Sequence, residues 1–111
     1  MNDERFPWCI LVPRRQGLQD LHELDDADSA ALFGEIRAVS LRLLALEDVD
    51  KLNVGALGNR VPQLHVHVVA RRTSDAAWPD PVWGNGQARP YSESTYQAML
   101  TRLRSGLNLA V

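Results

Sequence analysis

The fold is decided by the stretch Gln63-Leu64-His65-Val66-His67-Val68-Val69. Polar and apolar residues alternate through its first six positions, which is the period of a β-strand with two unlike faces. The sequence therefore predicts a strand over 63–69 that points Gln63, His65 and His67 to one side and the apolar residues to the other. Pro62 opens this strand, and Gly58-Asn59 before it indicate a turn.

The two histidines of this strand are expected to project together, separated by roughly 6–7 Å of backbone. Polar side chains are costly to bury without partners, so their face either meets solvent or lines a site. Spacing alone leaves three interpretations open. They are an exposed sheet face, a metal site that needs a third ligand, and catalysis by one imidazole supported by another. For the metal site, His22 and scattered carboxylates are the only further ligands available.

Three more elements are expected before the histidine strand. Apolar runs predict a buried strand over 6–12 and a second strand over 51–57. Between them, Asp25 is a typical helix N-cap, and apolar residues at spacings of three and four predict one long helix over 26–46. The buried face of that helix is expected to consist of Leu32, Ile36, Val39, Leu43 and Leu46.

After the histidine strand, the sequence predicts a long loop and a short helix. Residues 71–89 are rich in proline, glycine and tryptophan, which favours a loop. Ser92 is a typical N-cap for the terminal helix. The inner face of that helix is expected to carry Tyr96, Met99, Leu100 and Leu103.

Size and charge exclude several classes of protein. The chain has 111 residues, which fits one domain over 1–111, and a formal net charge of −2. That charge gives no broad attraction to nucleic acid or to an anionic membrane, so a bound anion must be held locally. Cys9 is the only cysteine, and no stretch reaches the ~20 apolar residues of a membrane helix. Since the chain also lacks a signal peptide, we expect a cytoplasmic protein.

The run from Gly58 to Val69 resembles the signature of the histidine-triad (HIT) superfamily, His-φ-His-φ-His-φ-φ after a glycine-containing turn, where φ is apolar. The segment Leu52-Asn53-Val54-Gly55 and the order of strand and helix are also similar, and residues 78–84 resemble a bacterial branch of HIT-like proteins. The resemblance implies an α+β fold, an antiparallel sheet with one long packing helix and a short C-terminal helix, in a homodimer. It also implies that the family's N-terminal strand pair, before residue 6, is missing here.

The resemblance further implies a nucleotide hydrolase or transferase that needs no cofactor or metal. His65 would attack the α-phosphate of a nucleoside phosphoramidate or dinucleotide and form a nucleotidyl-histidine intermediate, which water then cleaves. His67 would support His65 and fix its tautomer. The residues expected to bind the phosphate are Asn53, Gly58, Asn59, Arg60 and Gln63.

Three departures from the family pattern stand out. Gln63 occupies the position of the first triad histidine, Trp8 stands where the family often has histidine, and so does Gln16. These changes predict weakened or altered catalysis. They leave a catalytically weak nucleotide-binding or sensing module, or a His-x-His metal-binding protein, as alternatives. Three tryptophans are expected in packing or dimer contacts, namely Trp8, Trp78 and Trp83. The alternative is that Trp8 or Trp83 forms one wall of the nucleotide pocket.

Overall fold

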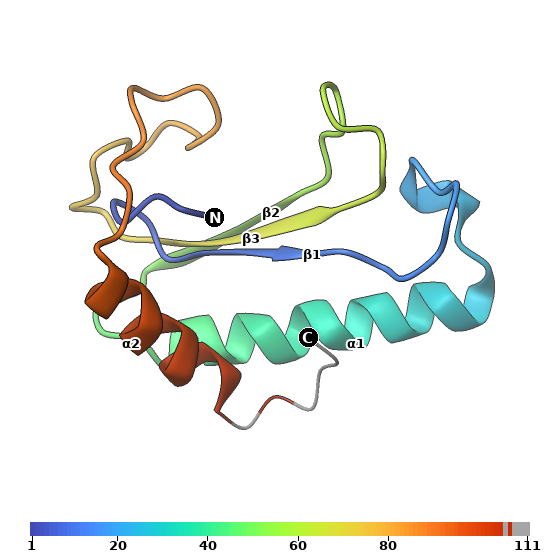
Figure 1. The fold of residues 1–111 in the computed structure, drawn as a ribbon, viewed down its shortest axis with the longest axis horizontal. Coiled ribbons are helices and arrows are strands. Elements are labelled where there is room, and N and C mark those ends of the chain that lie inside the picture. The colour runs from blue at the N-terminus through green and yellow to red at the C-terminus, as the bar shows by residue number, and fades with distance from the viewer. Residues whose placement is uncertain (106, 108–111) are drawn as a thin grey trace.

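The computed structural model describes residues 1–105 and 107. Its elements in chain order are β1 (Trp8–Leu11), the 3-10 helix η1 (Leu21–Glu23), α1 (Asp26–Leu44), β2 (Lys51–Gly55), β3 (Val66–Arg71) and α2 (Glu93–Arg104). The strands form one antiparallel sheet in the order β1-β3-β2. The histidine strand β3 is therefore central, as Figure 1 shows, and the predicted α+β architecture is confirmed.

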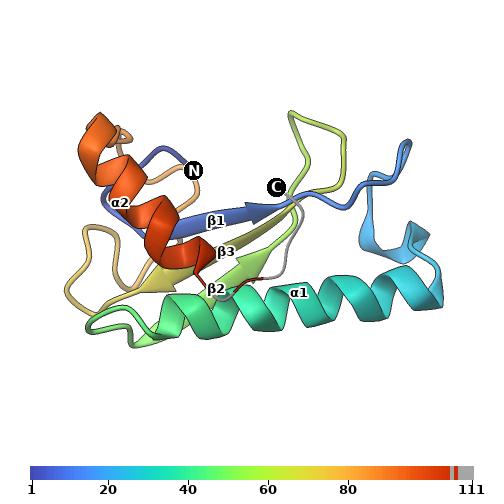
Figure 2. The same ribbon diagram turned by 60° about the horizontal axis from the view of Figure 1, so that its bottom comes forward.

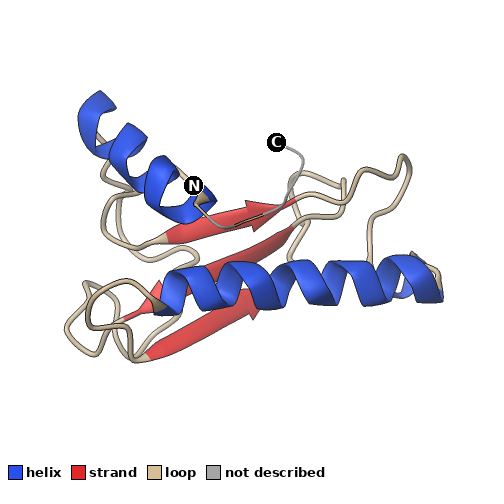
Figure 3. Cartoon of the chain, turned by 90° about the horizontal axis from the view of Figure 1, so that it is seen from below, coloured by secondary structure: helices blue, strands red, loops and turns tan. Residues whose placement is uncertain are grey.

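Helix α1 runs along one face of the sheet (Figure 3). Its N-cap is Asp25, as predicted, because the Asp25 carboxylate accepts a hydrogen bond from the Asp28 N–H at 2.7 Å. Four residues of the predicted apolar stripe pack with Val68 and Ala70 of β3, namely Ile36, Val39, Leu43 and Leu46. Four of the five stripe residues are buried and the fifth is half-buried; they are Leu32, Val39, Leu43, Leu46 and Ile36.

Helix α2 lies beside β1 at the edge of the sheet, next to α1 (Figure 2). It begins after Ser92, whose hydroxyl accepts from the Thr95 N–H at 3.3 Å. Met99 and Leu103 pack against the α1 cluster as predicted. Tyr96, which was predicted on the inner face, is 40% exposed, so the contact face of α2 is narrower than the sequence suggested.

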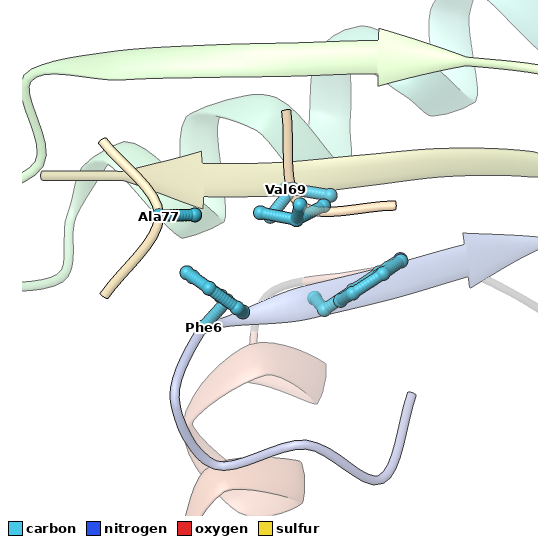
Figure 4. Close-up of a cluster of buried hydrophobic side chains, with 5 residues drawn as sticks. Phe6, Val69 and Ala77 are labelled. Atoms are coloured by element: carbon cyan, nitrogen blue, oxygen red, sulfur yellow. The ribbon is translucent and has the colours of Figure 1, made fainter. Parts of the chain in front are cut away.

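A second apolar cluster holds the loop after β3 on the face of the sheet opposite α1. Phe6 from before β1, Val69 of β3 and Ala77 of the loop converge there (Figure 4). Trp8 and Val82 complete the cluster. Because Val68 and Val69 face opposite sides of β3, the two clusters share one central strand but lie on different faces.

A buried ion pair fixes the start of that loop. The Arg71 Nε lies 2.7 Å from Asp75 Oδ2, and the two side chains are only 2% and 4% exposed. Burial alone would raise the pKa of Asp75. Hydrogen bonds from Arg71 and from the N–H groups of Arg72, Ala77 and Trp78 outweigh it, and the pKa falls to about 2. The carboxylate thus organises the chain from 71 to 78.

The strands are shorter than predicted, and this changes the surroundings of the site. β1 spans only Trp8–Leu11, β2 ends at Gly55, and β3 begins at Val66 instead of residue 63. Pairing stops because Leu11, the last residue of β1, lies opposite Val66. The preceding segment contacts the β1–α1 connection instead, where the Leu64 N–H donates to the Leu18 carbonyl at 2.8 Å.

Candidate active site

Strand register places the central site residues on the face opposite α1. Directly opposed residues of an antiparallel pair share a face. His67 lies opposite Ile10 of β1 and Gly55 of β2, and Asn53 lies opposite Val69. Since Val69 belongs to the cluster away from α1, His67 and Asn53 also project to that side.

His65 precedes β3, yet its ring lies beside that of His67. The ring centroids are 5.1 Å apart at an interplanar angle of 67°. The Nδ1 atom of His65 lies 2.7 Å from the Gln63 carbonyl oxygen. Because a carbonyl only accepts, Nδ1 carries the proton and Nε2 keeps its lone pair. The backbone of Gln63 therefore sets the tautomer of His65, whereas the sequence had predicted this role for His67.

His67 is paired with an indole. Its Nδ1 accepts a hydrogen bond from Trp8 Nε1 at 2.9 Å. Indole only donates, so His67 Nδ1 carries the lone pair and Nε2 carries the proton. Burial lowers the pKa of His67, and the nearby His65 and N-terminal amino group lower it further. The two rings are therefore complementary, with a lone pair on Nε2 of His65 and a proton on Nε2 of His67.

Two tryptophans enclose the His67 ring. Trp8 and Trp83 each approach it edge-on, with centroid distances of 5.6 Å. The absence of a side chain at Gly55 makes room for Trp83, whose ring lies 3.3 Å from the place a Cβ would occupy. The sequence predicted packing for both tryptophans but missed the hydrogen bond. The signal for it was the position of Trp8, where the HIT pattern often has histidine.

The predicted phosphate-binding residues nearest the strands differ in orientation. Asn53 Oδ1 accepts from Arg71 Nη1 at 2.8 Å, so the Asn53 amide is held with its NH₂ group as the remaining donor. Gln63, in contrast, donates from Nε2 to the Arg15 carbonyl at 3.2 Å. Its side chain is thereby engaged by the β1–α1 connection, away from the strand face where the sequence placed it.

The turn residues Gly58, Asn59 and Arg60 lie in the β2–β3 connection. Gly58 has a φ of +70°, which glycine adopts at little cost. Asn59 and Arg60 are exposed. Figure 1 shows this connection and the loop after β3 on the side of the sheet away from α1. Neither Asn59 nor Arg60 is brought into hydrogen-bond contact with His65.

Known proteins match this arrangement closely. A sequence model described as the HIT domain matches residues 1–74. The chain belongs to the histidine triad (HIT) family. No curated protein matches it significantly.

Solved structures of bacterial HIT proteins superimpose on nearly the whole chain. A histidine triad protein of Sinorhizobium meliloti has a TM-score of 0.92 and 46% identity, over 96% of this chain and 79% of the other. A histidine triad protein from Bradyrhizobium japonicum has a TM-score of 0.90 and 47% identity, over 95% of this chain and 78% of the other. A histidine triad protein from Marinobacter aquaeolei has a TM-score of 0.90 and 43% identity, over 95% of this chain and 77% of the other.

In this HIT chain the imidazoles of His65 and His67 lie side by side, whereas the Gln63 side chain donates to the Arg15 carbonyl. Within residues 1–105 and 107, no group of three or more histidine, cysteine, aspartate or glutamate side chains could hold a metal ion. The His-x-His pair thus has no third protein ligand there. None of the described helices is long and apolar enough to cross a membrane.

Proposed function

We propose that the protein is a nucleotide hydrolase or transferase in which His65 attacks the α-phosphate of a nucleoside phosphoramidate or dinucleotide. The proposal depends on the 2.7 Å contact between His65 Nδ1 and the Gln63 carbonyl. In the neutral ring that contact puts the proton on Nδ1 and the lone pair on Nε2, which is then a good nucleophile toward phosphorus. The substrate class is supported by the HIT family, whose members are generally nucleotide-binding hydrolases and transferases.

The reaction consists of two displacements at phosphorus. The His65 Nε2 lone pair forms a bond to phosphorus while the bond to the leaving amine or phosphate breaks, and the leaving group keeps the electron pair and takes up a proton. A water or another acceptor then adds to phosphorus, loses its proton, and displaces His65. The nucleotidyl-histidine intermediate is thereby resolved without an oxidant, a reductant or a metal.

Two donors on the strands are proposed to stabilise the phosphate charge. The Nε2–H of His67 belongs to the ring next to the nucleophile. The NH₂ group of Asn53 is held by the Arg71 contact to its oxygen. Donors fixed in advance stabilise a developing anion most effectively, because they need no reorganisation during the reaction.

The outer part of the ligand is assigned to the β2–β3 connection. Arg60 offers a guanidinium that can bind a phosphate through two hydrogen bonds. Gly58 and Asn59 offer their backbone N–H groups, and the Asn59 side chain offers an amide beside Arg60. We place Gln63 with these residues through its backbone, since its side chain is engaged by Arg15.

Replacement of the nucleophile tests this proposal. His65→Ala is expected to reduce turnover of adenosine phosphoramidate by on the order of 10⁴-fold, as for other members of catalytic triads. His22→Ala is the matched control, because His22 is an exposed histidine of η1. Equal turnover in wild type and His65→Ala contradicts the proposal, and loss in both variants shows that the assay reports folding instead of chemistry.

The alternative is a nucleotide-binding or sensing module with weak chemistry. It is favoured by the orientation of Gln63, which leaves the triad without its first side chain. This alternative expects a nucleoside monophosphate to bind in calorimetry while no phosphoramidate is turned over. Binding that is lost in Asn53→Ala would locate the ligand at the same face.

A homodimer is proposed from an exposed apolar surface at the β2 edge. Phe33 and Leu44 on one side of α1 are 70% and 47% exposed, and Val54 of β2 is 51% exposed. Val54 lies opposite Val68 and so faces the α1 side, and its strand β2 pairs on one edge only within the described residues. A second copy can cover this surface by two-fold symmetry. Phe33→Glu is expected to yield monomers in analytical ultracentrifugation, and an unchanged sedimentation coefficient contradicts this interface.

A further inference from the structure

The two tryptophans beside His67 are alike in packing but differ in hydrogen bonding. Both ring centroids lie 5.6 Å from that of His67, and both meet it edge-on. Trp8 Nε1 donates to His67 Nδ1 at 2.9 Å. Trp83 Nε1 is buried and has no hydrogen-bond partner among the described residues. The structure thus separates an indole that only packs on the imidazole from one that also fixes its protonation.

We propose that Trp8 is a positioning residue that locks His67 as the neutral Nε2–H tautomer, so that His67 serves as a permanent hydrogen-bond donor to the reacting phosphate. This inference rests on the proposed function for the role of the phosphate, but the tautomer itself can be measured without substrate. His67 is the residue in contact with the substrate, and Trp8 acts through it.

The lock follows from the chemistry of the two rings. An indole N–H can donate but cannot accept, so a neutral His67 must present the Nδ1 lone pair to Trp8. An imidazolium has protons on both nitrogens and would oppose one N–H to another. Protonation of His67 therefore requires loss of the Trp8 hydrogen bond. No hydrogen bond involves His67 Nε2 among the described residues, and His67 keeps 8% of its surface exposed, so this nitrogen can meet a ligand.

The surroundings of His67 also favour its neutral form. The charged or titratable groups that act on it are the His65 imidazole and the Met1 amino group, both of which oppose a positive charge. That amino group donates to the Trp8 carbonyl at 3.1 Å. The other facing groups are uncharged. They are Trp8 and Ile10 of β1, Gly55 and Asn53 of β2, and Trp83 of the loop.

A neutral His67 matters for the nucleophile next to it. A positive charge on His67, whose ring centroid lies 5.1 Å from that of His65, would repel the positive charge that the His65 ring gains as it bonds to phosphorus. Two histidines that both titrated near neutral pH would also make activity depend on a narrow pH interval. With Trp8 in place, His67 stays neutral in that range, so protonation of His67 should not appear on the acid side of the rate profile.

The test compares Trp8→Phe with the matched control Trp83→Phe, and its first readout is the tautomer. In ¹⁵N-labelled protein without ligand, long-range ¹H–¹⁵N correlation spectra identify which His67 nitrogen is protonated at each pH. Wild type and Trp83→Phe are expected to show only the Nε2–H form through pH 6.5. Trp8→Phe is expected to show both tautomers and a His67 titration at higher pH than in wild type.

A second measurement does not depend on the folding of a variant. In wild type, a scalar coupling across the hydrogen bond is expected between Trp8 Nε1 and His67 Nδ1. An Nδ1–H form of His67 in wild type overturns the proposal, and so does a Trp8→Phe spectrum identical to that of wild type. A change in Trp83→Phe as large as that in Trp8→Phe also overturns it, because packing would then suffice.

The kinetic readout separates this inference from the proposed function. Trp8→Phe is expected to lower kcat for adenosine phosphoramidate by roughly 10- to 100-fold with little change in KM, as for other partners that orient a histidine. Trp83→Phe, which keeps an aromatic ring beside His67, should lose clearly less kcat than Trp8→Phe. If His65→Ala retains full turnover, the proposed function fails while the tautomer measurement still decides the role of Trp8.

Discussion

The two faces of β3 are stabilised in different ways. On the α1 side, Val68 and Ala70 pack against leucines and a valine of the helix and need only shape and apolar surface. On the other side, His67 and Arg71 flank Val69, and each polar side chain has its own partner, Trp8 for one and Asp75 for the other. An apolar face tolerates exchange of similar residues, whereas each polar group on the second face depends on one particular neighbour.

The largest loss of stability is expected from the polar face. Asp75→Ala leaves the Arg71 guanidinium buried without its carboxylate, and loss of one partner of a buried ion pair destabilises by about 3–5 kcal/mol. Urea unfolding followed by circular dichroism measures this change. A loss below 1 kcal/mol would mean that the pair contributes no more than a surface salt bridge, and it would contradict the proposed difference in stabilisation between the two faces.

A somewhat smaller loss is expected from the apolar face. Leu43 is fully buried against the α1 side of the sheet, and Leu43→Ala should lower the free energy of unfolding by about 3 kcal/mol through the lost burial and the cavity. Under conditions where the variant is folded, its kcat should equal that of wild type. A selective fall in kcat would show that the two faces are coupled.

The pH dependence of stability should also belong to the polar face. The pKa of His67 in the folded protein lies below its ordinary value of 6.5. On acidification the unfolded chain therefore binds a proton at His67 before the folded chain does, and the free energy of unfolding falls as the pH drops below 6.5. The pKa of Asp75 is lowered from 3.8 to about 2, so its contribution is complete above pH 3.8 and is lost as the pH falls toward 2. Unfolding curves at several pH values should show both losses in Leu43→Ala, and His67→Gln should lack the first.

The smallest effect is expected at the start of α1. Asp25→Ala removes the acceptor of the Asp28 N–H and should destabilise by about 1 kcal/mol without altering the pH dependence below 6.5 that comes from His67. Thermal unfolding at pH 7 and pH 5 measures both quantities. A different pH dependence would mean that the helix start influences the histidine face.

The sequence predicted the apolar face well because local spacing encodes it. The repeat of Leu32, Val39 and Leu43 defines one side of a helix without any knowledge of its partners. In the same way, alternation placed Val68 on the face opposite His67, and α1 covers that face. The strand ends were not predictable from alternation, because β3 begins where β1 supplies a partner, at the pair Leu11 and Val66.

The polar face was predicted only in part, because its contacts join distant positions. The neighbouring rings of His65 and His67 follow from their spacing. The bond from Trp8 to His67 spans 59 positions and that from Arg71 to Asn53 spans 18, and both depend on strand register. Gln63 was assigned to the histidine face because the strand was expected to include it.

The stereochemistry at phosphorus tests the role of His65 most directly. With an adenosine phosphorothioate analogue that is chiral at phosphorus, hydrolysed in isotopically labelled water, two successive displacements through a nucleotidyl-histidine predict overall retention of configuration. A single attack by water, with His65 acting only as a base, gives inversion. Retention in wild type is the result we predict, and inversion would contradict the nucleophilic role of His65.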